Sequence, residues 1–338
     1  MKKLHFVGSR VVKTGVAIFI TALICQWLNW PAVFAVITAI VTIEPTVSDS
    51  IKKGIVRFPA SAIGSAYAVL FISLFGNSPL TYTLAAMFTI VTCFRLKLYA
   101  GLLVATLTAV AMIEVIHSNY FISFLIRLGT TSIGLIVSTL VNMFILPPDY
   151  TKNISNSIQR MAYQTGIAIE EVFSTILEGN SNEENEKNRK VDQLDDAIHQ
   201  AETLVRFQKE EAKFHPLVGK EKSEFQHMQK QLINLKLIHY HVDNLINTPL
   251  TSLSWTNDER AIILYSVKEL AEGLKDARHY KADKHAQHLR QLTEIFWEDN
   301  EEITRGNQNH PTSFPPELII LYELVSIYNQ VDRYYAIK

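Results

Sequence analysis

Six long apolar runs fill the first 146 residues of the chain, and they constrain its fold more than any other feature. A helix needs roughly 20 mostly apolar residues to cross the hydrocarbon core of a bilayer. A water-soluble core is a poor explanation for six such runs in so short a stretch, so the sequence predicts a six-helix transmembrane domain. The predicted spans are Val11–Trp30, Pro31–Val47, Phe58–Phe75, Pro79–Phe94, Leu98–His117 and Tyr120–Leu146.

The charge balance changes sign after the last run. Residues 1–149 carry ten Lys/Arg and four Asp/Glu, whereas residues 150–338 carry 22 and 29. We therefore predict a transmembrane domain over residues 1–149 and a separate domain over residues 150–338. The negative charge of the second domain argues against a nucleic-acid partner.

Basic residues cluster at alternate breaks between the runs, which predicts the orientation in the membrane. Lys2 and Lys3 precede the first run, Ile51–Arg57 contains two lysines and an arginine, and Arg95 and Lys97 follow the fourth run. Cytoplasmic loops are enriched in Lys and Arg. The sequence thus predicts a multi-pass protein of the inner or plasma membrane, with the lipid bilayer as a partner and both ends of the membrane domain in the cytoplasm.

An internal repeat relates the two halves of the predicted membrane domain. Residues 35–70 shifted by seventy positions without a gap give ten identities in 36 positions. Three spans repeated once must reverse their direction, so the repeat predicts an inverted 3+3 topology, a common plan in secondary transporters. The identities are Ala35/Ala105, Thr38/Thr108, Ala39/Ala109, Ile43/Ile113, Glu44/Glu114, Ser48/Ser118, Arg57/Arg127, Ile63/Ile133, Gly64/Gly134 and Leu70/Leu140.

The repeat places one glutamate and one arginine in each half. Glu44 and Glu114 each end an apolar run, either as acids at a helix end that reach water or as protonatable groups in a cavity. Arg57 is either a cytoplasmic anchor or part of a site. Arg127 either pairs with Glu114 or binds an anionic substrate through its guanidinium fork. The repeat therefore nominates Arg127 and Arg57 for substrate binding and Glu114 and Glu44 for proton coupling.

Residues 150–338 show helical periodicity and no strand alternation. Pro147 and Pro148 end the last span, and Pro216 and Gly179 mark further helix ends. The sequence predicts a cytoplasmic antiparallel helical bundle, so the fold class is all-α. The expected helices are Thr151–Glu178, 186–214, Lys220–Asn247, Asp258–His279, Ala282–Thr304 and Glu317–Ala336.

Enzyme and metal motifs do not emerge from the sequence. The closest histidine spacings are His285 with His288 and His239 with His241, and zinc usually needs three or four converging ligands. No phosphate-binding glycine loop, GxSxG or HExxH motif occurs. We therefore predict no enzyme activity, no metal site and no cofactor.

Several segments resemble the bacterial aromatic acid exporter family. They are RVVKTGVAIFITALI, WPAVFAVITAIVTIEPT, RFPASAIGS and VNMFILPP, in this order. The resemblance covers nearly the whole chain and is to the branch that joins six spans to a helical cytoplasmic domain. It implies an inner-membrane efflux carrier for aromatic carboxylic acids, related to fusaric-acid-resistance type pumps. It assigns no site residues, so those above rest on the repeat.

These observations favour a proton-coupled exporter of small, aromatic organic anions. Phe34, Tyr67 and Phe124 are each expected either to stack on the substrate ring or to pack toward lipid. The alternative is a membrane-anchored sensor or scaffold whose acidic helical domain binds a partner or metabolite. Helical carriers of this size often associate, so a homo-oligomer is expected.

Overall fold

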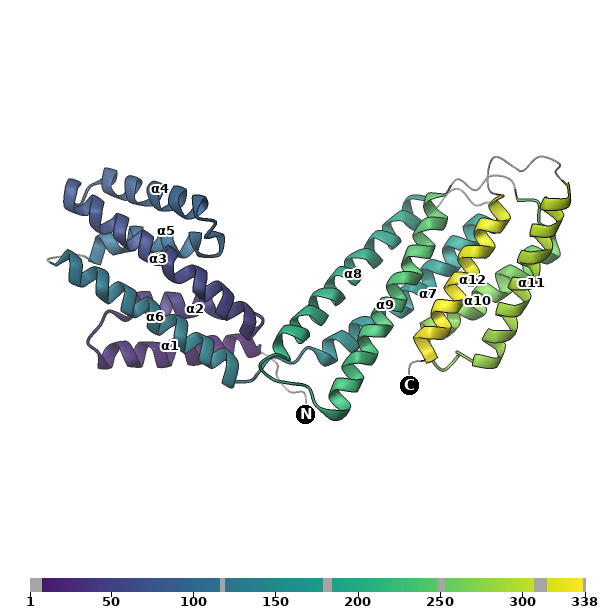
Figure 1. Ribbon diagram of the computed structural model, residues 1–338, viewed down its shortest axis with the longest axis horizontal. Helices are drawn as coiled ribbons and strands as arrows, with labels where there is room; N and C mark the ends of the chain where they lie inside the picture. The colour runs from purple at the N-terminus through teal and green to yellow at the C-terminus, as the bar shows by residue number, and fades with distance from the viewer. Residues whose placement is uncertain (1–7, 116–118, 179–183, 249–252, 307–314, 337–338) are drawn as a thin grey trace. The chain divides into compact units, whose positions relative to one another are not determined.

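The computed structural model describes residues 8–115, 119–178, 184–248, 253–306 and 315–336. Within these ranges the chain forms α-helices, a short 3-10 helix and no strand, which confirms the all-α class (Figure 1). Two compact units are present. One comprises Met1–Asp149 and Phe207–Pro216, and the other comprises Tyr150–Arg206 and Leu217–Lys338. The predicted basic pair Lys2 and Lys3 and the repeat position Ser118 lie outside the described residues.

Among its described residues, the first unit contains three helices that are long and apolar enough to cross a membrane, namely α1, α3 and α6. Two shorter apolar segments, α2 and η1–α5, accompany them. With eleven residues, α2 rises about 16 Å, roughly half of a bilayer core. The elements are α1 (Ser9–Trp27), α2 (Ala32–Thr42), α3 (Val47–Phe75), α4 (Pro79–Arg95), η1 (Tyr99–Gly101), α5 (Leu102–Val115) and α6 (Tyr120–Phe144).

Helix α3 begins eleven residues before the predicted third span, and this corrects the sequence-based boundary. The polar stretch Ile51–Arg57 was expected to be a break between spans, yet it forms the second and third turns of α3. Thr46 caps the helix, because its hydroxyl accepts the amide N–H of Asp49 at 3.0 Å. Pro59 lies inside the helix without ending it.

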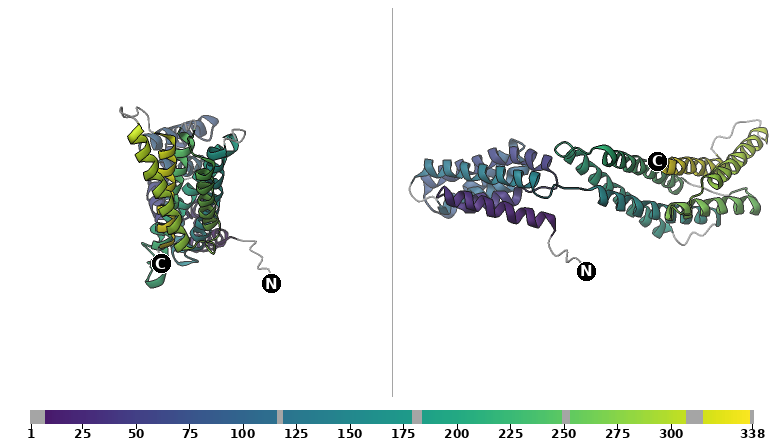
Figure 2. Two further views of the ribbon diagram at one scale, coloured as in Figure 1. Left: turned by 90° about the vertical axis from the view of Figure 1, so that its right-hand side faces the viewer. Right: turned by 90° about the horizontal axis from the view of Figure 1, so that it is seen from below.

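The two halves of the first unit pack in the same way. The repeat relates α1 to α4, α2 to α5 and α3 to α6. In the first half α1 packs on α2 and α2 packs on α6; in the second half α4 packs on α5 and α5 packs on α3. The two halves meet where α3 packs on α6. Figure 1 shows that corresponding helices of the two halves run in opposite directions, and Figure 2 gives two further views. This is the arrangement of an inverted repeat.

Two glycines make the same close contact in each half. A Cβ atom on Gly64 would lie 2.3 Å from the carbonyl oxygen of Ala105, and one on Gly134 would lie 2.4 Å from that of Ala35. The positions in these contacts differ by seventy residues. Small residues allow helix backbones to approach in this way, and the matched contacts show that the repeat is structural.

The ends of α1 and α4 are also equivalent, but at an offset of 68. The Trp30 N–H donates to the carbonyl of Cys25, and the Leu98 N–H donates to that of Cys93, both at 2.9 Å. Asn29 and Lys97 each adopt a positive φ, so both helices end in a Schellman motif. Two extra residues before α5 restore the offset of seventy, so α1 and α4 follow a different offset from the rest of the repeat.

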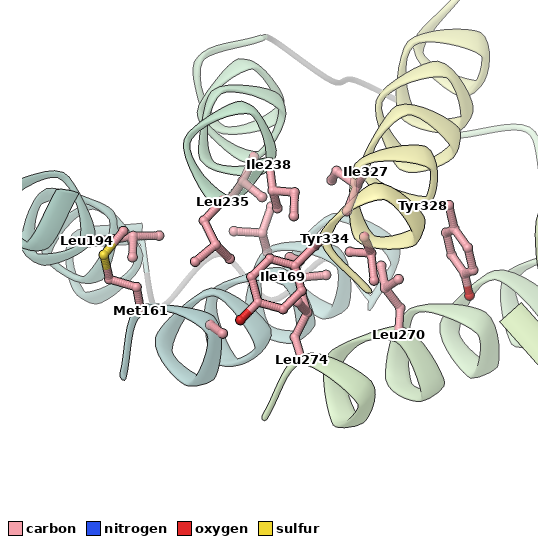
Figure 3. Packing of buried hydrophobic residues seen from close by; sticks show 14 of the residues in the cluster. Met161, Ile169, Leu194, Leu235, Ile238, Leu270, Leu274, Ile327, Tyr328 and Tyr334 are labelled. Atoms are coloured by element: carbon pink, nitrogen blue, oxygen red, sulfur yellow. The ribbon is translucent and has the colours of Figure 1, made fainter. Parts of the chain in front are cut away.

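The second unit is a helical bundle in which successive helices run in alternating directions (Figure 1). α7 packs on α9 and α10, and α12 packs on α9 and α11. Figure 3 shows part of its continuous apolar core, where Met161 of α7 and Leu194 of α8 lie together. Its helices are α7 (Thr151–Glu178), α8 (Glu184–Glu211), α9 (Gly219–Asn247), α10 (Asn257–Lys275), α11 (Ala282–Gly306) and α12 (Pro316–Ala336). The last five residues of α8 belong to the first unit.

Candidate functional site

Glu44 lies in the corner between α2 and α3, where the chain leaves the helical conformation. A residue before proline is disfavoured in the α region, so Pro45 ends α2 at this point. The Glu44 N–H donates to Ser50 Oγ at 3.2 Å, and Ser50 Oγ donates to the Thr42 carbonyl at 2.9 Å. The corner thereby holds the Glu44 carboxylate against the first turns of α3.

An ion pair joins Glu44 to Arg57, and we call it the Glu44–Arg57 clamp. Arg57 Nη2 lies 2.8 Å from Glu44 Oε1, and the two side chains are 8% and 10% exposed. The half-exposed Lys53 contacts the other carboxylate oxygen at 2.8 Å. Arg57 Nε and Nη1 donate to the carbonyls of Ala100 (3.2 Å) and Val41 (3.0 Å). All three guanidinium nitrogens are therefore used.

Asn142, near the end of α6, ties the same corner to α1. Its amide nitrogen lies 3.1 Å from the Glu44 carbonyl, 3.3 Å from the Thr46 carbonyl and 2.9 Å from Ser50 Oγ. Its amide oxygen accepts from the buried Lys13 Nζ at 2.8 Å. These two buried polar residues connect three helices around the clamp, and neither is among the site residues predicted from the sequence.

Two neighbouring acids of the first unit, Glu210 and Glu211, complete the corner. The Val47 N–H donates to Glu211 Oε2 at 3.2 Å, and Lys52 Nζ lies 3.2 Å from Glu210 Oε1. Negative charge is favourable at the N-terminus of a helix. The acids therefore stabilise the beginning of α3.

Arg127 is the second buried arginine, and four helices meet at its guanidinium. It lies in α6 with 3% of its surface exposed. Its Nη2 donates to the Thr108 hydroxyl of α5 and lies 3.5 Å from Ser61 Oγ of α3. Its guanidinium carbon lies 4.2 Å from the ring centre of Phe34 in α2.

Arg127 differs from Arg57 in its lack of a counter-ion. Its Nε and Nη1 are buried and have no hydrogen-bond partner among the described residues, and none of their carboxylates forms an ion pair with it. A buried, unpaired charge is unfavourable, and a desolvated cation–π contact offsets only about 2 kcal/mol of that cost. The position is therefore suited to receive an anion.

Glu114 does not meet Arg127, although the sequence allowed that pairing. It is exposed at the end of α5, and its carboxylate accepts a hydrogen bond from the Tyr82 hydroxyl. Glu44 and Arg57, with the same thirteen-residue separation, do form a pair. Of the two repeat-related pairs of site residues, the structure brings Glu44 and Arg57 into contact and leaves Glu114 and Arg127 apart.

Comparisons with known proteins identify the family. Residues 5–145 match the model of "Aromatic acid exporter family member 1". A UPF0421 protein of Oceanobacillus iheyensis is 48% identical over 99% of this chain and 97% of its own length. UPF0421 proteins of Bacillus cereus and Staphylococcus aureus are 45% and 34% identical over 98% of the chain. The chain belongs to the UPF0421 proteins, and its residues 5–145 belong to the aromatic acid exporter family.

Membership of the aromatic acid exporter family, together with the apolar helices, makes the chain a membrane protein. The family match ends within one residue of the end of α6, so it covers the helices that carry Glu44, Arg57, Glu114 and Arg127. The similarity to UPF0421 proteins extends through the second unit as well.

Among the aromatic side chains proposed for stacking, Phe34 contacts Arg127. Tyr67 instead donates to or accepts from Thr92 Oγ1 at 2.9 Å and packs on Phe71 and Phe88. Phe124 packs beside an apolar cluster of α3, α4 and α5. The signal that could have indicated the hydroxyl partners of Arg127 is the repeat itself, because Thr108 is one of its identities.

Two histidines of the second unit have structural contacts. His285 Nε2 lies 2.9 Å from the Tyr328 carbonyl, and His241 Nδ1 lies 2.5 Å from Glu323 Oε2. Burial lowers the pKa of His285 and of His239. No group of three or more potential metal ligands occurs in the described part of the chain.

Proposed function

We propose that this protein exports small aromatic carboxylic acids or related organic anions, and that Arg127 binds the substrate carboxylate. The observation that carries the proposal is the buried Arg127 guanidinium, which has two unpaired nitrogens and no carboxylate partner within the described part of the chain. Guanidinium–carboxylate contacts are short, charge-assisted hydrogen bonds. The family to which the chain belongs is named for aromatic acid export, which supports the same substrate class.

The short helices support a transport site at this place. α2 and α5 occupy corresponding positions in the two repeats, and both are shorter than α3 and α6. Unusually short apolar segments at corresponding positions of an inverted repeat point to the binding site of a transporter. Phe34 belongs to α2 and Thr108 to α5, so both short helices contribute to the surroundings of Arg127.

In the proposed cycle Arg127 and Arg57 hold the carboxylate in alternate states, and Glu114 and Glu44 carry protons. Protonation removes the charge of Glu44 and weakens the Glu44–Arg57 clamp, which couples proton uptake to the freedom of Arg57. Glu114 is exposed, so it exchanges protons with solvent at the opposite end of the unit. Neither step is enzymatic, and no cofactor takes part.

The proposal includes a multi-pass topology in the cell membrane. All six helices of the first unit cross or enter the bilayer, both ends of this unit face the cytoplasm, and the second unit is cytoplasmic. Labelling of single cysteines at exposed positions in intact cells, with a membrane-impermeant maleimide, tests this arrangement. Light scattering of the purified protein tests the expected homo-oligomer.

Benzoate transport in proteoliposomes tests the function. The wild type should move labelled benzoate in response to an imposed pH gradient, and Arg127→Met should abolish that movement. Glu44→Gln and Glu114→Gln should retain benzoate exchange at equal pH but lose the response to the gradient. A gradient response that persists in both glutamine variants rules out the proton role, and wild-type liposomes that move no aromatic acid rule out export.

The sensor or scaffold remains the second candidate because the second unit has a polar groove of about 720 Å³ between α7 and α9. Lys152, His227 and Lys230 are among its lining residues, so an anionic metabolite is the ligand it would suit. This function predicts saturable metabolite binding to the full chain that Lys152→Gln and Lys230→Gln weaken, with no benzoate transport in the wild type.

A further inference from the structure

The two buried arginines occupy equivalent positions but have different partners. Arg57 binds the carboxylate of Glu44, whereas Arg127 contacts the hydroxyls of Thr108 and Ser61. The close contacts of Gly64 and Gly134 are nevertheless the same in both halves. The two repeats therefore pack in the same way, but their arginines differ in whether a carboxylate pairs with them.

Each hydroxyl partner of Arg127 has a hydroxyl at its own repeat-related position. Thr108 corresponds to Thr38, and Ser61 corresponds to Thr131, since each pair is separated by seventy residues. Thr38 and Thr131 are both buried. The Thr38 hydroxyl donates to the Phe34 carbonyl of its own helix at 2.9 Å and makes no described contact with Arg57. The Thr131 hydroxyl donates to the Arg127 carbonyl of its own helix at 2.9 Å and lies 3.3 Å from Ser61 Oγ. A second set of hydroxyls thus exists at the positions that the repeat relates to the partners of Arg127, and Arg57 makes no described contact with either of them in this structure.

We propose that Arg57, Thr38 and Thr131 form a latent second binding site for an aromatic carboxylate, which opens when the two repeats exchange roles. In that second state Arg57 leaves Glu44 and takes the two threonines as partners, while Arg127 pairs with Glu114. The substrate class and the role of Arg127 rest on the proposed function; the exchange and the second hydroxyl set are the new elements.

The exchange keeps the number of buried arginines that are paired with a glutamate constant, which favours it over independent movement of either arginine. In the observed state a glutamate neutralises one buried arginine, and the other has no counter-ion among the described residues. The second state has the same charge count with the partners reversed. Removing an arginine from its glutamate without a replacement would leave a buried charge unpaired, which typically costs several kcal/mol. A bound carboxylate supplies the replacement charge, so substrate is carried from one arginine to the other.

A double-mutant cycle on benzoate binding tests the latent site. The full chain in lipid nanodiscs is titrated with benzoate as wild type, Thr38→Val, Glu44→Gln and the double variant. Thr38→Val should change the benzoate Kd less than about twofold in the wild-type background, because Thr38 is not at the Arg127 site. In the Glu44→Gln background, which weakens the clamp, it should raise Kd about tenfold, the size of one hydrogen bond to a charged group.

The repeat provides matched controls for this cycle. Thr108→Val should show the opposite pattern, with the larger loss in the wild-type background. Thr38→Ser retains the hydroxyl and should bind as the parent does in both backgrounds. The Glu44→Gln/Glu114→Gln double variant also removes the partner of Arg127 in the second state. In this variant the benzoate Kd should again depend on the Thr108 hydroxyl and no longer on that of Thr38.

Equal effects of Thr38→Val in both backgrounds would overturn the latent site while leaving the Arg127 site intact. Absence of saturable benzoate binding in the wild type would instead remove the proposed function together with this inference. A second measurement needs no change at Glu44: Thr38→Val should slow benzoate exchange in proteoliposomes although its Kd is unchanged. Wild-type exchange rates in that variant would also contradict the exchange of roles.

Discussion

The hydroxyl oxygens of Ser61 and Thr131 lie 3.3 Å apart, and the two residues are seventy positions apart in the sequence. Contact between a residue and its own repeat counterpart occurs where the pseudo-two-fold axis passes between them. Arg127 Nη2 lies 3.5 Å from the same Ser61 oxygen. The candidate anion site is therefore on the axis, at the interface of the repeats, which is where inverted-repeat transporters bind their substrates.

The matched glycine contacts predict a stability loss on either side. Gly64→Ala and Gly134→Ala each place a Cβ against a backbone carbonyl that cannot move aside. Each should cost about 1–3 kcal/mol, the usual cost of overpacking, and lower the thermal midpoint in detergent. Gly15→Ala is the control, since nothing lies within 4 Å of its Cβ position in α1. An unchanged midpoint in both test variants would contradict the close approach.

The Glu44–Arg57 clamp predicts strongly non-additive energetics. Glu44→Ala leaves the buried Arg57 without its carboxylate and should destabilise the protein by about 3–5 kcal/mol. Glu44→Ala combined with Arg57→Met removes both charges and should be less destabilised than Glu44→Ala alone. Thermal or denaturant unfolding of the three variants measures the coupling. Additive losses would mean that the two side chains do not depend on each other.

Asn142 predicts a polar requirement at the end of α6. Asn142→Leu leaves Lys13 Nζ and the carbonyls of Glu44 and Thr46 without their partner, so it should cost at least about 1–3 kcal/mol. Asn153→Leu is the comparison, because Asn153 is an exposed residue of α7. Similar thermal midpoints for the two variants would show that the Asn142 network contributes little.

Much of the fold follows from sequence pattern alone. Helix α7 has the predicted bounds, and α9, α11 and α12 begin within one residue of them, because apolar periodicity and flanking Pro or Gly mark these helices. The start of α3 was missed because Ile51–Arg57 resembles a polar break. Its lysines belong to a helix that Thr46 caps, and charge pattern alone does not separate these cases.

The site was predictable only in part, for a physical reason. The repeat identified Glu44, Arg57, Glu114 and Arg127 as related residues, but which of them pair depends on the direction of the chain at each corner. Lys13 and Asn142 are 129 positions apart and belong to no repeat identity, so only the packing of α1 on α6 brings them together.

Buried histidines predict a loss of stability in acid. Burial lowers the pKa of His285 and His239 below that of the unfolded chain, whose value is 6.5. The unfolded state then binds more protons, so stability falls as pH drops through about 6.5 and toward the folded pKa values. Thermal midpoints at pH 5.5 and 7.5 measure this loss. His285→Gln should reduce it, and an equal pH dependence in that variant would exclude His285 as a contributor.

The most direct test of the central claim compares two ligands of the same shape and different charge. Titration of the full chain with benzoate and with neutral benzamide measures how much of the affinity depends on the carboxylate. We predict that the wild type binds benzoate at least about tenfold more tightly, as expected for one charge-assisted contact, and that Arg127→Gln loses this preference. A preference for benzoate that persists unchanged in Arg127→Gln would contradict the assignment of Arg127 as the carboxylate-binding residue.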